Sequence, residues 1–562
     1  MQNNRERLPM TQLALVILAI ACALSVLAIL AAAKPSPAEP GRPAQQELRV
    51  TEAGGGDPGP LSPVQKKAIK EGPLVPNEAD YERDKAAANA RAPSGGEPSQ
   101  AAPGSAVPTS FRSWDGVFDT NFGPSDSTGA IGTNRYIELV NATFAIYNRT
   151  SDVPLSTGSL ASLVGAVAGA NVFDPQVIWD PATKRFYYVT DTVISATDNR
   201  VSFGFSKTAS PSSAADFCKY EVSHGSAFPD YPKLGDLGGA GNNGLILYGS
   251  NTFSGTSGAY LGSDIYSLTK PPAGTTCPAP STFTVGAKFS LKDSDGTTPV
   301  FTPVPANQTD TSSTGYAVAN SANKPSTRIP TFRITKSISN TLVVDPVRNV
   351  TVASYDIPAA AQQAGTTRRL DTLDSRHTQA VSAIDPARGG VTAIWTQHTV
   401  FGGAGARVRW YEINPNPATP VLFQSGTISG ASTGASNRYV YNAAISPDRQ
   451  RKGSTAKFGS NMVIGFNTSS TTQTVDIRMA SKIGNNAVTF QATPIRTSPA
   501  SLDDFTCTSG TCRWGDYSAA TPDPATPLSA SRGQVWLTNG FVRTTGGSFG
   551  SGWGTRNWAA TP

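Results

Sequence analysis

The chain has 562 residues, with 46 Lys and Arg, 40 Asp and Glu, 53 Gly, 43 Pro and a net charge of +6. The basic residues are scattered rather than gathered into a stripe, which argues against nucleic-acid binding. No Gly-rich loop follows a strand and opens a helix, which argues against nucleotide binding. Short apolar runs, many Gly and Pro residues and no sustained 3.6-residue period favour an all-β fold.

The amino terminus contains a segment that could cross a membrane. Arg5 and Arg7 precede residues 11–33, a run of uncharged and mostly apolar residues. A run of this length is sufficient for a transmembrane helix. Because arginines remain on the cytoplasmic side, we expect residues 1–10 in the cytoplasm and the rest of the chain outside it.

The same segment also carries a possible cleavage signal. Ala31 and Ala33 form the small-residue pattern that precedes signal-peptide cleavage, although the apolar run is longer than a usual signal-peptide core. The segment is therefore either an uncleaved signal-anchor or a signal peptide, and its length favours the anchor. In both cases the protein is expected to be extracytoplasmic, either anchored to the cell membrane or secreted.

Residues 34–109 are rich in Pro, Ala and Gly and contain almost no aromatic residues. Such a segment cannot bury enough apolar surface to offset its conformational entropy. We predict a disordered linker that holds a globular domain, residues 110–562, away from the membrane.

A pattern of two strands recurs seven times between Ser125 and Asn539. The first strands are STGAIG (127–132), DPQVIW (174–179), YPKLGD (231–236), TPVPAN (302–307), HTQAVS (377–382), YNAAIS (441–446) and DYSAAT (516–521). The second strands are RYIELV (135–140), RFYYVT (185–190), GLILYGS (244–250), GYAVAN (315–320), VTAIWT (391–396), NMVIGFN (461–467) and QVWLTN (534–539). The copies lie roughly 46 to 76 residues apart, which suits a propeller whose blades have long loops.

The residue types fit that interpretation. The innermost strand of a propeller blade lies where neighbouring blades converge, so small residues and Pro are favoured there. The second strand packs against sheets on both sides and favours aromatic and β-branched residues. We therefore predict one seven-bladed β-propeller. Strands near Phe111 and Gly552 are suited to closing the ring, with Trp114, Trp553 and Trp558 packed at the closure.

Four cysteines follow the apolar segment, and an even number in an oxidising compartment favours disulfides. Cys507 and Cys512 flank a Ser-Gly turn that can bring them together. Cys218 and Cys277 each precede a first strand and are the second predicted pair. The alternative is four free, buried thiols.

Four segments carry a resemblance to a known family. DPQVIWDPATKRFYYV (174–189), RVRWYEINP (407–415), RWGDYSAATPDP (513–524) and GWGTRNW (552–558) resemble secreted bacterial sialidase-like β-propeller proteins, mostly of unassigned activity. The resemblance covers most of the chain from about Phe111 onward. It implies a sialidase-like propeller and leaves the activity open.

The chain departs from true sialidases in its motifs. It has none of their Asp-box turns, and its only Arg-Ile-Pro, at Arg328, follows the fourth repeat instead of preceding the first. The predicted propeller has three glutamates, Glu138, Glu221 and Glu412, and each alternates with apolar residues in a strand. We expect them to face outward rather than to take part in catalysis.

Polar residues at the starts of the first strands are the candidate ligand-binding residues, because ring closure gathers these starts around one mouth of the channel. Adjacent Arg376 and His377 face opposite ways, so one of them is expected to point into the channel. The alternative for Asp174 and Asp516 is that each fixes the loop entering its strand. The selected residues are Asp174, Asp230, Arg376, His377, Tyr441 and Asp516.

No cofactor or metal site is predicted. The three histidines, His224, His377 and His398, lack a metal-ligand spacing, and DSDG at Asp293 lacks the later acidic ligands of a calcium loop. We expect a monomer that binds a glycan or a cell-surface protein without catalysis and contacts the membrane through its amino-terminal helix. The alternative is a divergent glycoside hydrolase that uses acids such as Asp174 and Asp230.

Overall fold

A computed structural model describes residues 48–54, 74–92, 108–118, 122–239, 243–271, 277–452, 455–491, 493–507, 510–543 and 552–562. The predicted cytoplasmic terminus, residues 1–10, and the apolar segment, residues 11–33, lie outside these ranges. Within these ranges no helix is both long and apolar enough to span a bilayer. The description below concerns the unit Glu47–Pro562.

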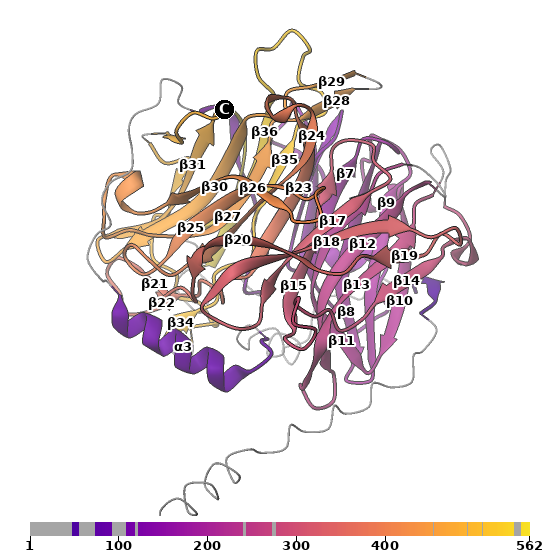
Figure 1. Ribbon diagram of the computed structural model, residues 1–562, viewed down its shortest axis with the longest axis horizontal. Coiled ribbons are helices and arrows are strands. Elements are labelled where there is room, and N and C mark those ends of the chain that lie inside the picture. The colour runs from indigo at the N-terminus through magenta and orange to yellow at the C-terminus, as the bar shows by residue number, and fades with distance from the viewer. Residues whose placement is uncertain are drawn as a thin grey trace, which may run out of the picture. The chain divides into compact units, whose positions relative to one another are not determined.

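Each of the seven predicted strand pairs forms an antiparallel pair. The described residues form nine sheets, of which seven have four or five strands, and we number these seven sheets 1 to 7 in chain order (Figure 1). Sheet 1 contains β3 (Thr128–Ile131), β4 (Arg135–Val140), β5 (Thr143–Asn148) and β6 (Pro154–Ser159). Sheet 2 contains β7 (Asn171–Asp180), β8 (Arg185–Ser195), β9 (Asp198–Ser206), β10 (Phe217–Gly225) and β1 (Val50–Glu52). Sheet 3 contains β11 (Ala227–Leu237), β12 (Leu245–Ser254), β13 (Tyr260–Thr269) and β14 (Val285–Lys288).

The remaining four large sheets follow the same antiparallel plan. Sheet 4 contains β15 (Val300–Pro305), β17 (Gly315–Ser321), β18 (Ser326–Lys336), β19 (Leu342–Val344) and β20 (Arg348–Tyr355). Sheet 5 contains β23 (His377–Asp385), β24 (Val391–Val400), β25 (Arg407–Asn414), β26 (Val421–Ile428) and, in parallel to β23, β16 (Asn307–Gln308). Sheet 6 contains β27 (Tyr439–Pro447), β30 (Met462–Ser470), β31 (Gln473–Lys482), β32 (Thr489–Phe490) and β33 (Arg496–Thr497). Sheet 7 contains β35 (Ala519–Pro522), β36 (Val535–Arg543), β37 (Gly552–Thr561) and β2 (Thr109–Phe118).

Shorter elements connect or cover these sheets. One small sheet contains β21 (Ala361–Gln362), β22 (Arg369–Leu370) and β34 (Thr511–Cys512), and the other contains β28 (Gln450–Lys452) and β29 (Thr455–Lys457). The described α-helices are α3 (Glu78–Arg91) and α4 (Leu160–Val164). The chain is therefore an all-β domain with little helix.

The large sheets contact one another in chain order. The first strand of each sheet from 2 to 7 contacts strands of the sheet before it: β7 contacts β3, β11 contacts β7, β15 contacts β11, β23 contacts β15, β27 contacts β23, and β35 contacts β27. Strands β35 and β36 also contact β3, so sheet 7 meets sheet 1. The first strands thus lie where neighbouring sheets meet, which is why Ala, Gly, Ser and Pro suit them.

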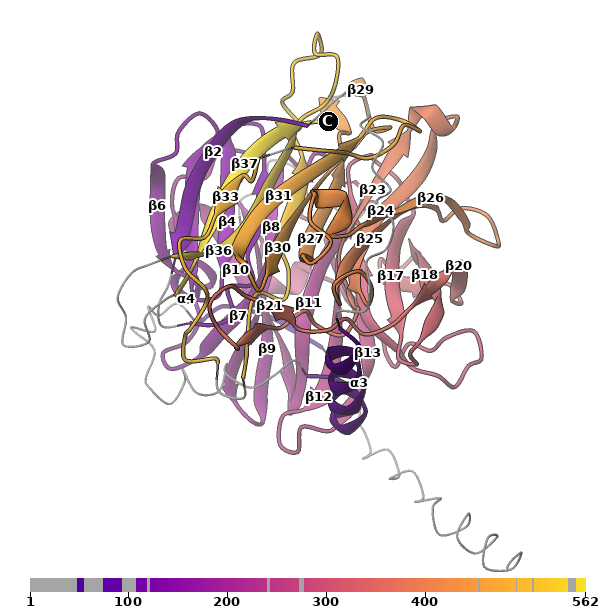
Figure 2. The ribbon, with the colours of Figure 1, turned by 90° about the vertical axis from the view of Figure 1, so that its left-hand side faces the viewer.

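The two ends of the domain join in sheet 7. Strand β2 pairs with β37 along its length (Figure 2). Trp114 of β2 is buried against sheet 1, with ring centroids 5.7 Å from Tyr136 and 5.4 Å from Tyr147, and it also packs at 5.9 Å from Trp536 of sheet 7. The predicted closure by the terminal strands is confirmed.

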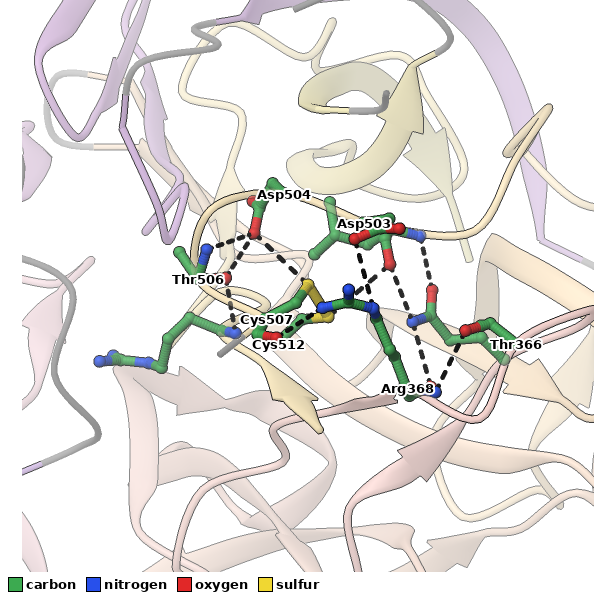
Figure 3. Close-up of a disulfide and its surroundings, with 10 residues drawn as sticks. Thr366, Arg368, Asp503, Asp504, Thr506, Cys507 and Cys512 are labelled. Carbon is green, nitrogen blue, oxygen red and sulfur yellow. Dashed lines mark hydrogen bonds and ion pairs between the residues drawn. A yellow bond between two sulfur atoms is a disulfide. The ribbon is translucent and has the colours of Figure 1, made fainter. Parts of the chain in front are cut away.

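Both predicted disulfides are present. Cys218 of β10 bonds to Cys277 beyond β13, and Cys507 bonds to Cys512. Figure 3 shows Arg368 extended toward the second disulfide, where its Nη1 donates to the carbonyl oxygen of Cys507 at 2.5 Å. Two disulfides suggest an extracellular location, because cytosolic thiols are normally kept reduced.

Two described segments of the predicted linker are ordered, so the expectation of disorder over residues 34–109 is wrong for them. Strand β1 pairs with β10, and α3 lies against β21, β22 and β34 (Figure 1). Asn77 caps α3 by accepting from the N–H of Asp80 at 3.2 Å. Tyr81, Lys85 and Ala88 are buried along one face of the helix. Strand β1 and helix α3 are ordered because they contact the sheets, and amino-acid composition alone does not predict such contacts.

The three glutamates expected to face outward are buried instead. Glu138 accepts hydrogen bonds from Asn557 at 2.7 Å and Tyr147 at 3.1 Å, which joins sheets 1 and 7. Glu221 pairs with Arg200 at 2.7 Å, and the Glu412 carboxylate lies 3.6 Å from Arg388. Neighbouring sheets cover both faces of these strands, so alternation with apolar residues does not imply exposure.

We predict that Trp114→Ala lowers the free energy of unfolding by about 3–5 kcal/mol, because it leaves a cavity at the closure between sheets 7 and 1. The measurement is urea unfolding monitored by far-ultraviolet circular dichroism, because the substitution itself alters tryptophan fluorescence. Phe111→Ala, on the same strand but at a position that is 50% exposed, is the matched control and should change stability by less than about 1 kcal/mol. Equal losses in the two variants would contradict the assigned closure.

Candidate functional site

The first strands share an irregular backbone at their starts. Asp174, Tyr231, Thr302 and Asn442 all have positive φ, from 47° to 60°, and each lies where the pairing with the second strand shifts register. Asp126, just before β3, has φ 42°. Left-handed backbone is unfavourable for residues other than Gly, so the surroundings must stabilise each of these bulges.

Polar side chains from the preceding sheet supply that support. Asn141 Oδ1 accepts from the N–H of Asp174 at 2.8 Å, and Asn251 Oδ1 accepts from the N–H of Thr302 at 2.8 Å. Asn320 Oδ1 accepts in the same way from the N–H of His377 at 2.7 Å. Each second-strand amide therefore holds the start of the next sheet's first strand.

The sequence analysis missed this signal. Six of the seven predicted second strands end with, or are directly followed by, an Asn or Asp: Asn141, Asp191, Asn251, Asn320, Asn467 and Asn539. A recurring amide or carboxylate at one end of a repeated strand indicates a shared hydrogen-bonding role. Comparing the ends of the repeats would have found it.

Four of the six predicted site residues interact with one another. The charge of Asp516 raises the pKa of both Asp174 and Asp230, and the charge of Arg376 lowers that of Asp230. Asp516 itself accepts from Arg513 Nη2 at 2.8 Å, through each carboxylate oxygen. The starts of sheets 2, 3, 5 and 7 thus converge on one acidic cluster.

Burial is the largest cause of the altered pKa values in this cluster. It raises the pKa of Asp174 and of Asp230 to about 7, with neighbouring carboxylates adding to the shift. Burial also raises the pKa of Asp126 and Asp191 well above the usual range. The nearest carboxylate oxygens of Asp174, Asp191 and Asp230 lie within 4.8 Å of one another.

Lysine and arginine side chains lie among aromatic rings at this end of the channel. Lys233 Nζ is 3.9 Å from the ring centroid of Tyr231 and 3.1 Å from that of Tyr517. Arg376 lies over Tyr231 at 4.7 Å and bonds to Asp374 through Nε at 2.8 Å. The Arg376 pair with Asp374 contributes to lowering the pKa of that carboxyl.

The structure does not bring His377 and Tyr441 into this cluster. His377 points between sheets, stacked on His398 with ring centroids 4.6 Å apart, and its Nδ1 lies 3.2 Å from the carbonyl oxygen of Gln397. Tyr441 is buried in an apolar cluster and donates to Ser469 Oγ at 3.0 Å. Of the adjacent residues 376 and 377, Arg376 lines a pocket and His377 does not.

A pocket of about 420 Å³ lies beside Arg376, between α3 and the starts of sheets 4 and 5. Helix α3 provides Asp80, Tyr81 and Arg83, and the opposite wall contains Phe301 and residues 320–324. None of the acids with raised pKa lines this pocket. Its floor is the Arg376 pair with Asp374.

Buried polar contacts fix α3 in this position. Lys85 Nζ donates to Thr372 Oγ1 at 2.9 Å and to the carbonyl oxygen of Leu373 at 2.7 Å, and it lies 3.5 Å from Asp371. Arg376 Nη2 donates to the carbonyl oxygen of Leu74 at 3.2 Å. The segment before the sheets therefore forms one wall of the pocket.

No family model and no curated protein matches this chain. Solved structures of propeller and sialidase type do match, all at low identity. The phage phi92 endosialidase is 7% identical with a TM-score of 0.36, covering 80% of this chain and 69% of that one. The Dos1 propeller is 8% identical with a TM-score of 0.36, covering 81% and 95%. An α-L-arabinanase from Penicillium chrysogenum is 12% identical with a TM-score of 0.31, covering 68% and 92%.

We predict that His377 makes stability fall with decreasing pH. Burial lowers the pKa of His377 from 6.5 to about 3, so between these values the unfolded state binds a proton that the folded state excludes. In the unaltered protein, His377 should make the free energy of unfolding fall by about 1.4 kcal/mol per pH unit below pH 6.5. His377→Gln should abolish this contribution. Urea unfolding of both proteins at pH 7.5, 6.0 and 5.0 measures the difference. Parallel pH profiles would contradict the structural role of this histidine.

Proposed function

We propose that this protein is a seven-bladed β-propeller, tethered outside the cytoplasm, that binds a glycan or a surface-protein ligand without turning it over. The seven large sheets are its blades, the domain spans residues 110–562 and residues 11–33 provide the anchor. Cyclic contact between the sheets and the pairing of β2 with β37 support a closed ring. The two disulfides support the extracytoplasmic location.

The pocket beside Arg376 is the proposed ligand site, and its lining is the observation that carries the proposal. It combines charged and amide groups on its walls, among them Arg83, Asn323 and Lys324, with the rings of Tyr81 and Phe301. Such a mixture suits a polar ligand with some apolar surface. Its volume of about 420 Å³ falls in the range of small-ligand sites.

The position of the acids favours binding over hydrolysis. A glycoside hydrolase needs two carboxyl groups flanking the scissile bond. The acids that line the pocket are Asp80, Asp84 and Asp374, and each of them pairs with an arginine. Asp174 is only 7% exposed and does not line the pocket.

One observation favours the alternative, a divergent glycoside hydrolase. Asp174 and Asp230 have pKa values of about 7, the range in which a carboxylic acid donates a proton at neutral pH. For these residues to act, a sugar would have to bind outside the pocket beside Arg376, because neither residue lines it. We therefore propose binding, with hydrolysis as the alternative.

We predict that the full-length protein in detergent binds glycans on an array. The mass of these glycans should be unchanged afterwards. Lys324→Ala and Asn323→Ala should each weaken binding about tenfold, equivalent to about 1.4 kcal/mol. Lys288→Ala, at an exposed position outside the pocket, is the control and should bind as the unaltered protein does.

The same array distinguishes the two functions. Release of monosaccharide that disappears in Asp174→Asn or Asp230→Asn would replace the binding function by the hydrolase. Binding that is insensitive to Lys324→Ala and Asn323→Ala would place the ligand elsewhere on the domain.

A further inference from the structure

Asp191 is a carboxylate at a position where equivalent strands carry an amide. Asn141, Asn251 and Asn320 each accept from a backbone N–H of the next sheet through Oδ1. Each also donates through Nδ2, Asn251 to Thr302 Oγ1 at 3.0 Å and Asn320 to the carbonyl oxygen of Ser375 at 2.7 Å. Asp191 can only accept, so its second oxygen requires a proton or a cation.

The environment of Asp191 leaves that requirement unmet. The side chain is 0% exposed, and neither carboxylate oxygen has a partner at hydrogen-bonding geometry. The backbone N–H of Tyr231 lies close enough to lower its pKa slightly, against a much larger effect of burial. A fully buried carboxylate without strong partners is costly and indicates a missing ion or water.

Two further carboxylates face the same point. Asp174 lies at the bulge of β7, Asp191 on β8 and Asp230 on β11, so three strands of two adjoining sheets supply them. Their nearest oxygens lie within 4.8 Å of one another. Oxygen ligands lie about 2.3–2.6 Å from Ca²⁺, so oxygens on opposite sides of one ion are about 4.6–5.2 Å apart. The spacing therefore fits three ligands around a single ion.

The other acids of the cluster already have protein partners. Asp126 accepts from Asn141 Nδ2 at 2.7 Å and from the N–H of Asp516 at 2.7 Å. Asp516 is held by Arg513, and Asp374 by Arg376. Across the described part of the chain, no Lys or Arg forms an ion pair with Asp174, Asp191 or Asp230.

Lys233 is the cation that could compete for these carboxylates. Its Nζ is buried, has no hydrogen-bond partner and lies over the rings of Tyr231 and Tyr517. Burial lowers the pKa of this lysine well below its usual range, although Asp174 opposes the shift. Lys233 is therefore a weak counterion for three carboxylates.

We propose that Asp174, Asp191 and Asp230 bind one Ca²⁺ ion, with water completing its coordination shell. An all-oxygen, all-carboxylate set selects a hard divalent cation over zinc or copper. This site was not expected from the sequence, because its ligands come from separate repeats and follow no loop motif. The ion would join sheets 2 and 3 at the channel mouth, and the proposal does not rest on the pocket or on its ligand.

Asp191→Asn is the decisive variant, because it restores the amide found at equivalent positions and should fold. After treatment with EDTA, the full-length protein in detergent is titrated with CaCl2 by calorimetry. We expect one binding site, and an affinity more than about 100-fold weaker in Asp191→Asn. Asp152→Asn makes the same chemical change at an exposed turn and should bind Ca²⁺ normally.

Thermal unfolding gives a second, independent readout. Ca²⁺ should raise the Tm of the unaltered protein and of Asp152→Asn but leave that of Asp191→Asn unchanged. Without Ca²⁺, Asp191→Asn should have a higher Tm than the unaltered protein, because an amide can both donate and accept where neither Asp191 oxygen has a hydrogen-bond partner. The proposal is overturned if EDTA-treated protein takes up no Ca²⁺, if only Mg²⁺ binds, or if Asp191→Asn binds Ca²⁺ as tightly as the unaltered protein.

Discussion

The hydrogen bond that a second-strand side-chain oxygen accepts from a backbone N–H of the next sheet organises this domain. Asn141 with Asp174, Asn251 with Thr302 and Asn320 with His377 repeat the same contact between successive sheets. Each contact is buried, so losing it would leave an unsatisfied N–H as well as a strained bulge. Because the contact recurs, it ties the start of each of these first strands to the sheet before it.

This arrangement concentrates charge in a buried place. Asp174, Asp230 and Asp516 come from different sheets, yet the charges of Asp230 and Asp516 add to the effect of burial in raising the pKa of Asp174. Arg513 and Arg376 neutralise part of the charge through pairs with Asp516 and Asp374. The acids that lack such partners lie where sheets 2 and 3 meet, and a bound cation would stabilise that junction.

The segment before the sheets changes what the channel mouth presents to a ligand. Helix α3 has no large aliphatic side chain, yet Lys85 is buried and bonded to Thr372 and Leu373. With α3 in place, the pocket is lined by mixed polar and aromatic groups and not by Asp174, Asp191 or Asp230. The proposal of binding rather than hydrolysis rests on this separation between the pocket lining and the carboxylates.

The sequence by itself determined the all-β class, the seven strand pairs, the closing strands and both disulfides, because these depend on local alternation, residue size and cysteine spacing. It also predicted that Asp174, Asp230, Asp516 and Arg376 lie near one another, because strand starts in a repeated fold converge, while their role in ligand binding stays a prediction. Only the tertiary structure decided that His377 and Tyr441 pack between sheets, since alternation shows that neighbours diverge but not which one faces the channel. The tertiary structure also decided that the cluster includes Asp191, Lys233 and Arg513 and that α3 is ordered. Both depend on contacts between residues far apart in the chain, which no local pattern encodes.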